Sequence, residues 1–137
     1  MKNVRVLLVD DQVEFVETLV KRITRRGLDI RGVSSGQEAL AFLDAHPVDV
    51  VVLDVKMPGM DGIEVLRLIK RLHPGIEVIM LTGHASLEMA MKGMENGAYD
   101  YLMKPMDIDE LLYKIEDASN LKQLQSERET FGPEATQ

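Results

Sequence analysis

A regular alternation of two kinds of segment, repeated five times, most constrains how this 137-residue chain can fold. Short, mainly apolar runs rich in branched side chains predict strands, and the run at residues 28–33 is the weaker second strand. Each run is followed by a stretch whose apolar residues recur every three or four positions, which predicts an amphipathic helix. The predicted strands are residues 4–9, 28–33, 48–53, 76–81 and 98–102, and the helical apolar stripes fall at residues 13–23, 40–43, 63–72, 87–94 and 111–115.

Turn and cap residues punctuate these segments. Ser34 or Ser35, with Gln37 or Glu38 three residues later, is typical of a capping box that opens a helix. Glycine and proline then mark places where helices end. The predicted helix-ending residues are Gly27, Pro47, Pro74 and Gly97.

The order of the elements predicts the fold class. Because a helix separates every pair of neighbouring strands, we expect the strands to run parallel in one sheet, with helices on both faces. This is the doubly wound, five-stranded α/β class. Ligands of such sheets bind at the carboxyl ends of the strands. The sequence contains neither a P-loop nor a GxGxxG motif, so a nucleotide site of those kinds is not expected.

Charged and polar residues stand at the predicted strand ends. Asp10 and Asp11 follow the first strand, Asp54 the third, Thr82 closes the fourth, and Lys104 follows the fifth. Two like charges ~5 Å apart repel by roughly 3 kcal/mol at an effective dielectric of ~20, so three clustered carboxylates need a cation. Oxygen ligands without Cys or His suit Mg²⁺ better than zinc or a full calcium cage. The sequence therefore predicts a Mg²⁺ site at this rim.

Composition limits the remaining possibilities. The length suits one domain, which we place at residues 1–120, with residues 121–137 as a polar tail or the start of a linker. No apolar stretch is long enough to cross a bilayer, and the N-terminal run lacks a signal-peptide cleavage site, so a cytoplasmic location is expected. The net charge of -7 argues against direct nucleic-acid binding. The absence of cysteine excludes disulfides and thiolate metal sites.

Several motifs together resemble the receiver domain of two-component response regulators. They are Asp10-Asp11, Asp54 followed by MPGMDG, Thr82-Gly83, and Tyr101-x-x-Lys104-Pro105, in order within residues 3 to about 118. The resemblance implies a flavodoxin-like (βα)5 fold with strand order 2-1-3-4-5. It also implies a phosphorylation-dependent signalling switch rather than an enzyme.

The resemblance assigns a role to each residue of the acidic rim. Asp54 would take a phosphoryl group from the phosphohistidine of a sensor histidine kinase. Asp10, Asp11 and Asp54, with the backbone carbonyl of Lys56, would hold the Mg²⁺ that neutralises and positions the reacting groups.

The resemblance also implies how the signal is read. Lys104 would pair with phosphoryl oxygens, and Thr82 would hydrogen-bond another of them. Tyr101 would then swing into the space that Thr82 vacates, which changes the surface of the fourth helix, fifth strand and fifth helix. Pro105 is a candidate for a cis peptide bond with Lys104.

Two further side chains are expected to tune the lifetime of the phosphoryl group. They are Lys56, two residues after Asp54, and His84, two residues after Thr82. Neither is a carboxylate or amide suited to orienting an attacking water, so we expect a fairly long-lived phosphoryl state.

Each residue also has a simpler interpretation by itself. Asp10 or Asp11 could cap the first helix, Thr82 could belong to a turn, Tyr101 could be core packing, and Lys104 could be a solvated surface lysine. The five positions argue for a site because they agree with one another.

A function from another class also fits part of the pattern. Phosphatases of the haloacid dehalogenase type also use a strand-end aspartate, here Asp54, together with Mg²⁺. Their motif has a second aspartate two residues later, where this chain has Lys56. A flavodoxin is disfavoured because no Trp and no hydroxyl-rich phosphate loop is present.

The sequence leaves the output of the predicted switch open. The chain could act on a separate partner, or it could be a receiver cut from a longer regulator whose linker begins near Leu121. Activation could also pair two copies through the last helix, although its apolar spacing is too irregular for a coiled coil.

Overall fold

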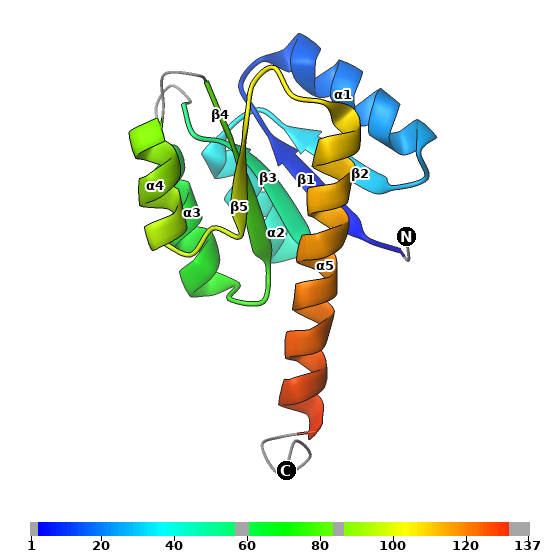
Figure 1. Ribbon diagram of the computed structural model, residues 1–137, viewed down its shortest axis with the longest axis vertical. Coiled ribbons are helices and arrows are strands. Elements are labelled where there is room, and N and C mark those ends of the chain that lie inside the picture. Colours follow the sequence, from blue (N-terminus) through cyan, green and yellow to red (C-terminus); the bar gives the residue numbers. More distant parts are fainter. Residues whose placement is uncertain (1–2, 57–60, 84–86, 132–137) are drawn as a thin grey trace.

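The computed structural model describes residues 3–56, 61–83 and 87–131, the last seven of them by backbone alone. Strands and helices alternate along the chain, as the apolar pattern predicts (Figure 1). The strands are β1 (Arg5–Val9), β2 (Asp29–Val33), β3 (Val50–Asp54), β4 (Glu77–Thr82) and β5 (Asp100–Met103). The helices are α1 (Val13–Arg25), α2 (Gly36–Ala45), α3 (Gly62–Leu72), α4 (Leu87–Glu95) and α5 (Ile108–Phe131).

The five strands form one parallel sheet in the order β2-β1-β3-β4-β5. Helices α1 and α5 cover one face, and α2, α3 and α4 cover the other (Figure 1). The predicted doubly wound class and the strand order implied by the resemblance are both confirmed. The chain forms β2 on one side of β1 and then crosses over to form β3 on the other side. The order of strands therefore reverses between β1 and β3, whose carboxyl ends lie side by side.

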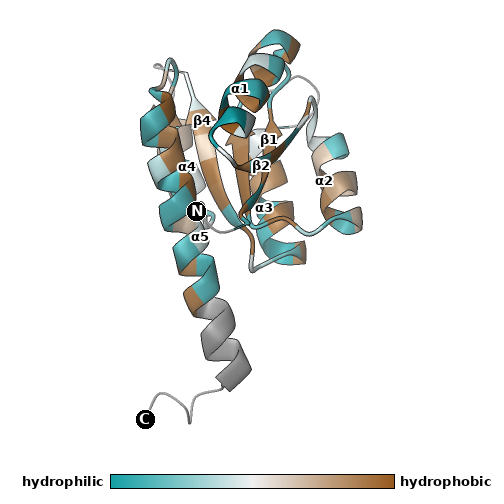
Figure 2. Ribbon diagram, turned by 90° about the vertical axis from the view of Figure 1, so that its right-hand side faces the viewer, coloured by the Kyte–Doolittle hydropathy of each residue, from teal (hydrophilic) through white to brown (hydrophobic). Residues whose placement is uncertain are grey.

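The core consists of two apolar layers, one on each face of the sheet. Successive strand residues point to opposite faces, so Leu8 packs toward α1 and α5 while Leu7 packs toward α2 and α3. Every residue of β3 is buried, and its residues before Asp54 are all apolar, as expected of a strand covered on both faces. Figure 2 shows hydrophobic residues along the strands and hydrophilic ones on the outer helix faces.

Local contacts explain where helices begin and end. The Ser35 hydroxyl accepts a hydrogen bond from the Glu38 N–H at 3.1 Å, which makes Ser35 the N-cap of α2. The Glu38 carboxylate accepts from the N–H and hydroxyl of Ser34. The predicted capping box is therefore present, except that the Glu38 carboxylate binds Ser34 instead of the N-cap residue Ser35. Gly27 and Gly97 follow α1 and α4 with φ of 92° and 100°, a conformation that favours glycine.

The ends of several elements differ from the sequence prediction. Strand β5 begins at Asp100 rather than at residue 98, although Ala98 is buried. An apolar run indicates which residues are buried, and buried residues extend beyond those that pair with a neighbouring strand. Helix α5 continues through residue 121 to Phe131, far beyond its last core residue, Ala118 (Figure 1). No helix among the described residues is long and apolar enough to cross a membrane.

An ion-pair cluster joins α5 to the amino-terminal edge of the sheet. The buried Asp49 carboxylate accepts hydrogen bonds from the backbone N–H and the guanidinium of Arg5, at 2.9 to 3.1 Å. The Lys122 ammonium lies 3.4 Å from the same carboxylate. Burial alone would raise the pKa of Asp49, but the hydrogen bonds from Arg5 and the two positive charges outweigh it and lower that pKa.

Candidate functional site

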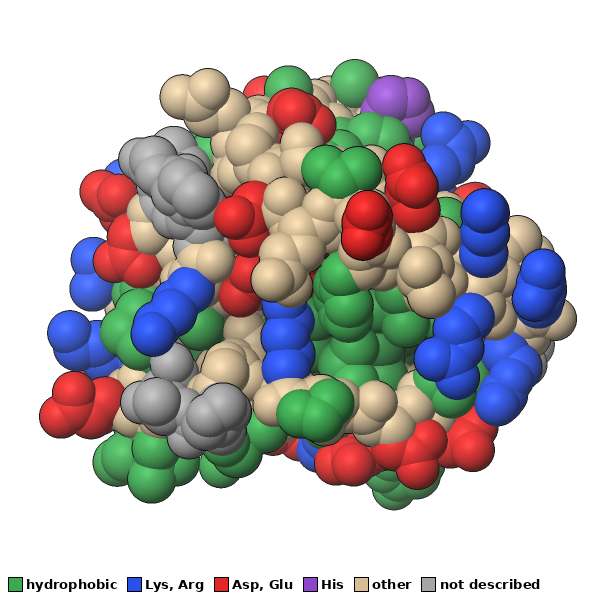
Figure 3. Space-filling view, turned by 90° about the horizontal axis from the view of Figure 1, so that it is seen from above, with side chains coloured by type: hydrophobic (Ala, Val, Ile, Leu, Met, Phe, Trp, Pro, Cys, Tyr) green, Lys and Arg blue, Asp and Glu red, His purple; other side chains and the backbone are tan. Residues whose placement is uncertain are grey.

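The predicted site residues meet at the carboxyl-terminal rim of the sheet. Asp10 follows β1, Asp54 ends β3, Thr82 ends β4, and Lys104 follows β5. The side chains of Asp10, Asp54 and Thr82 are buried. Figure 3 looks down on this end of the molecule and shows acidic side chains beside a basic one near its middle.

Backbone hydrogen bonds continue past the strand ends and hold the rim in place. The Asp10 N–H donates to the Val33 carbonyl at 3.2 Å, and the Lys104 N–H donates to the Thr82 carbonyl at 2.8 Å. The Val55 N–H donates to Leu81 in the same way. The side chains therefore project from a rigid ladder, which keeps their relative positions constant.

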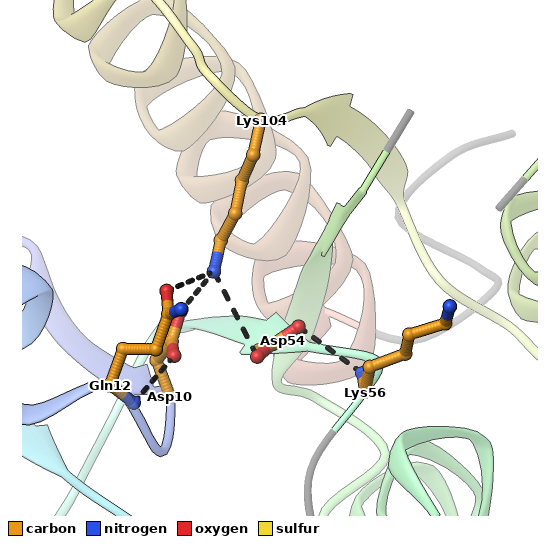
Figure 4. A network of polar contacts seen from close by, with 5 residues as sticks. All are labelled: Asp10, Gln12, Asp54, Lys56 and Lys104. Carbon is orange, nitrogen blue, oxygen red and sulfur yellow. Dashed lines mark hydrogen bonds and ion pairs between the residues drawn. The ribbon is translucent and has the colours of Figure 1, made fainter. Parts of the chain in front are cut away.

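Three carboxylates form the centre of the site. One oxygen from each of Asp10, Asp11 and Asp54 lies within 4.8 Å of the others. Asp54 Oδ1 accepts a hydrogen bond from the Lys56 N–H at 3.1 Å, and Asp10 Oδ1 accepts one from the Gln12 N–H at 3.0 Å. These bonds hold both carboxylates in fixed orientations, as Figure 4 shows.

Lys104 supplies the positive charge of the cluster. Its Nζ lies 2.6 Å from Asp10 Oδ2 and 3.8 Å from Asp54 Oδ2 (Figure 4). Gln12 Oε1 lies 3.5 Å from the same ammonium. The lysine is therefore bound more closely to Asp10 than to Asp54.

The environment of Asp54 disfavours its ionised form. Burial, together with the negative charges of Asp10 and Asp11, raises the pKa of Asp54 from its ordinary 3.8 to about 6. The Lys56 N–H and the charge of Lys104 act in the opposite direction but do not cancel this effect. A cation placed beside Asp54 would stabilise its carboxylate.

The donor set fits a small, hard divalent cation. When all three carboxylates are ionised, the single ammonium of Lys104 leaves two negative charges uncompensated, which matches the charge of Mg²⁺. The available ligands are carboxylate oxygens, which Mg²⁺ prefers. Asp11 is only half-buried, so water molecules can complete an octahedral shell.

The remaining predicted residues lie around this cluster. Tyr101 is half-buried on β5 and packs against the core layer beneath α2 and α3. The peptide bond between Lys104 and Pro105 is cis. The Lys56 side chain is exposed and points away from Asp54 (Figure 4). His84 lies outside the described residues.

Gly62 explains one feature of the loop after β3. A Cβ atom at this position would lie 2.5 Å from the Val55 Cα and 2.9 Å from the Asp54 carbonyl oxygen. The Gly62 N–H donates to the Val55 carbonyl at 3.3 Å. The start of α3 can approach the end of β3 this closely because residue 62 has no side chain.

Sequence reasoning missed two residues that touch the site. Gln12 and Phe15 both contact the Lys104 ammonium, and the Phe15 ring centroid lies 4.5 Å from its Nζ. Phe15 lies in the first turn of α1, three residues after the N-cap residue Gln12, so the two side chains can reach the same side of the helix. The spacing of these residues is visible in the sequence. The sequence does not show that the Lys104 side chain, which follows β5, extends to contact them.

Comparison with known proteins decides the family. Residues 6–116 match the family described as the response regulator receiver domain. This chain belongs to the receiver domain family of response regulators. It is therefore a signalling domain, a phosphorylation-dependent switch of the two-component type. Receiver domains bind Mg²⁺ through acidic residues, and this one has the acidic cluster described above. The comparisons give no support to a phosphatase of the haloacid dehalogenase type.

Curated relatives of this receiver domain are much longer proteins. The DNA-binding transcriptional regulator NtrC of Proteus hauseri is 39% identical over 86% of this chain and 25% of its own length. The C4-dicarboxylate transport transcriptional regulatory protein DctD of Rhizobium meliloti is 33% identical over 92% of this chain and 27% of its own length. The chain thus spans about a quarter of the length of the curated relatives it matches.

Solved structures show the same fold. A CheY-like receiver domain protein from Methanospirillum hungatei is 30% identical, with a TM-score of 0.85, and the match covers 90% of this chain and 99% of that one. NtrX from Brucella abortus, solved with ADP, is 30% identical with a TM-score of 0.89, over 95% of this chain and 30% of that one.

Proposed function

We propose that Asp54 of this receiver domain accepts a phosphoryl group from the phosphohistidine of a sensor histidine kinase, in a reaction that requires Mg²⁺. The observation that carries the proposal is the position of a buried strand-end carboxylate among two further acids and one lysine. Asp54 is favoured over Asp10 as the nucleophile because Asp10 is fully buried and bound closely by Lys104 at 2.6 Å.

The transfer step exchanges one bond to phosphorus for another. A carboxylate oxygen of Asp54 forms a bond to phosphorus while the bond between phosphorus and the donor imidazole nitrogen breaks. The bonding electron pair returns to that nitrogen, and the donor leaves as a neutral imidazole because its other ring nitrogen carries a proton. Asp10, Asp11, Asp54 and the backbone carbonyl of Lys56 would hold Mg²⁺, whose chemistry here is to neutralise charge on the phosphoryl oxygens.

Lys104 and Thr82 are proposed to bind the product. The Lys104 ammonium lies 3.8 Å from Asp54, so a short movement of its flexible side chain brings it to a phosphoryl oxygen. Thr82 ends the neighbouring strand and offers a hydroxyl donor to another oxygen. Both contacts favour the phosphorylated form because they add charge-assisted hydrogen bonds that the free carboxylate lacks.

The switch is proposed to pass from Thr82 to Tyr101 and from there to the surface of α4, β5 and α5. Tyr101 pairs with Met80 on the neighbouring strand and remains half-buried, so its ring has room to rotate. The added phosphoryl charge of about -1.5 to -2 biases two arrangements that already exist. Exposed apolar side chains on this surface, including Met91, Met103 and Tyr113, are suited to partner contact.

The output is proposed to lie outside residues 1–120, with 121–137 as a tail or the start of a linker. The curated relatives are named as transcriptional regulators, so an attached or separate module that controls transcription is the favoured output. The receiver itself is proposed to make no direct nucleic-acid contact, because its net charge is -7, and to work in the cytoplasm. It is proposed to catalyse only its own phosphorylation and dephosphorylation.

Phosphorylation is also proposed to drive pairing of two copies. The expected result is a doubling of the mass measured by light scattering when Mg²⁺ and beryllofluoride are added to the wild type. Asp54→Asn serves as the control, because it cannot form the beryllofluoride adduct. An unchanged mass of the wild-type adduct would exclude pairing.

The lifetime of the phosphoryl group is proposed to depend on Lys56 and His84. Because the Lys56 side chain points away from Asp54, it cannot orient an attacking water, and slow hydrolysis follows. We expect Lys56→Asn to speed the loss of phosphate, since an amide can position that water. Following phosphate release after the donor is removed measures the effect, and equal rates for variant and wild type would sink the idea.

Intact-mass measurement tests phosphoryl uptake directly. The wild type, incubated with Mg²⁺ and acetyl phosphate, is expected to gain the mass of one phosphoryl group. Asp54→Asn is expected to gain none, and chelation of Mg²⁺ should abolish the gain of the wild type. Equal uptake by both proteins would refute the proposed function.

A further inference from the structure

The aromatic ring of Phe15 contacts the ammonium of Lys104. The Phe15 ring centroid lies 4.5 Å from Lys104 Nζ, well inside the ~6 Å reach of a cation–π interaction. Phe15 stands in the first turn of α1 and is half-buried against the core layer shared by α1 and α5. Its position is therefore fixed by packing.

The same segment contacts this ammonium at two other points. Gln12 is the N-cap residue of α1, but its side chain makes no capping hydrogen bond. Its Oε1 instead lies 3.5 Å from Lys104 Nζ (Figure 4). Asp10 Oδ2 lies 2.6 Å from the same atom. Asp10, Gln12 and Phe15 thus surround the ammonium from the β1–α1 side.

This arrangement holds the ammonium away from Asp54. The distance from Lys104 Nζ to Asp54 Oδ2 is 3.8 Å, which is longer than a hydrogen bond. The ammonium therefore serves as the counter-ion of Asp10, one of the three carboxylates of the acidic cluster. A divalent cation that binds these carboxylates must compete with it, because the two positive charges repel.

We propose that Phe15 is a positioning residue that holds the Lys104 ammonium on Asp10 and thereby weakens Mg²⁺ binding by the acidic cluster. The inference rests on the proposed Mg²⁺ site. Loss of the ring would weaken the hold on Lys104 and leave Asp10 more available to the metal. A cation–π contact at a partly exposed site corresponds to about a two- to fivefold change in affinity.

Calorimetric titration with MgCl₂ at constant ionic strength tests the proposal. Phe15→Leu keeps an aliphatic side chain against the core but removes the ring, and we expect it to bind Mg²⁺ about two- to fivefold more tightly than the wild type. Phe15→Tyr restores a ring and should restore the wild-type affinity. Tyr99→Leu removes another half-buried aromatic from the same core layer, far from the rim, and should leave the affinity unchanged.

A double-mutant cycle separates the contact from general packing effects. On a Lys104→Met background no ammonium remains, so adding Phe15→Leu should not change Mg²⁺ affinity further. The NMR shifts of the Lys104 ε-methylene protons give a second readout. The ring should move them upfield in the metal-free wild type, and this displacement should disappear in Phe15→Leu and on addition of Mg²⁺.

The possible outcomes distinguish this inference from the proposed function. If the wild type shows no saturable Mg²⁺ binding, the proposed metal site fails, and the inference fails with it. If the wild type binds Mg²⁺ but Phe15→Leu binds it equally or more weakly, the inference alone is overturned. It is also overturned if Phe15→Leu tightens binding to the same extent in the Lys104→Met background.

Discussion

At the scale of single residues, burial of the Asp54 carboxyl group weakens the fold at neutral pH. Its pKa is about 6 in the folded protein against an ordinary value of 3.8. Between these values the folded state binds the proton that the unfolded state has released. The free energy of unfolding therefore falls as pH rises from about 4 to about 6, and the loss persists at higher pH.

Replacing Asp54 by Asn should consequently stabilise the metal-free protein at neutral pH. We expect Asp54→Asn to raise the free energy of unfolding by about 1–3 kcal/mol at pH 8, with the difference shrinking as pH falls from 6 toward 4. Urea unfolding in the presence of EDTA across this pH range measures it. Glu116→Gln, an exposed acid on α5, is the control and should show no comparable gain. A variant no more stable than the wild type at pH 8 would contradict the expectation.

The residues of the acidic cluster could be predicted from sequence, but their contacts could not. Asp10, Asp11 and Asp54 each follow a buried strand, and the carboxyl ends of parallel strands meet at one rim. The approach of Lys104 to Phe15 depends on the rotamers of a long, flexible side chain, which no periodicity encodes.

At the scale of elements, a polar contact attaches α5 to the sheet just beyond its apolar stripe. The apolar stripe that packs α5 on the sheet ends with Ala118, and Lys122 then reaches the buried carboxylate of Asp49. Arg5 binds the same carboxylate from β1. The helix is therefore attached to the sheet beyond the region where hydrophobic packing holds it.

We expect substitutions of Asp49 and of Lys122 to differ in their effects on the stability of the fold. Asp49→Ala removes the acceptor of several charge-assisted bonds, so we expect it to lower the free energy of unfolding by about 1.5–3 kcal/mol. Lys122→Met should cost less than about 1 kcal/mol, because the lysine is partly exposed, but should speed hydrogen exchange in residues 119–124.

Urea unfolding and hydrogen exchange measure these effects. The pKa of Asp49 is lowered, so its contribution is fully present above about pH 4 and is lost as pH falls below that value. Exchange of residues 119–124 that is the same in Lys122→Met and wild type would show that the contact does not hold α5.

Element types were easier to predict than element ends. Each of the five runs contains a strand, and the apolar character is strongest in the central strands, which are buried on both faces. Residues 119–131 favour a helix by composition but carry no regular apolar stripe, so the sequence allowed α5 to continue without indicating where it ends.

At the scale of the whole molecule, the fold brings a few side chains from distant parts of the chain to one rim. Asp10 and Lys104 are 94 residues apart in sequence, yet their charged atoms lie 2.6 Å apart. The parallel sheet produces this meeting because every strand ends on the same side. Apolar layers pack against both faces of the sheet and support the rim from below.

Asp54 is the residue proposed to carry the phosphoryl group. Borohydride reduction of an aspartyl phosphate gives homoserine, so peptide mass mapping after reduction of the phosphorylated wild type locates the acceptor. We expect homoserine at position 54, and none at Asp10 or Asp11, in samples that received Mg²⁺ and a phosphoryl donor. Homoserine at another aspartate, with residue 54 unchanged, would contradict this account of the site.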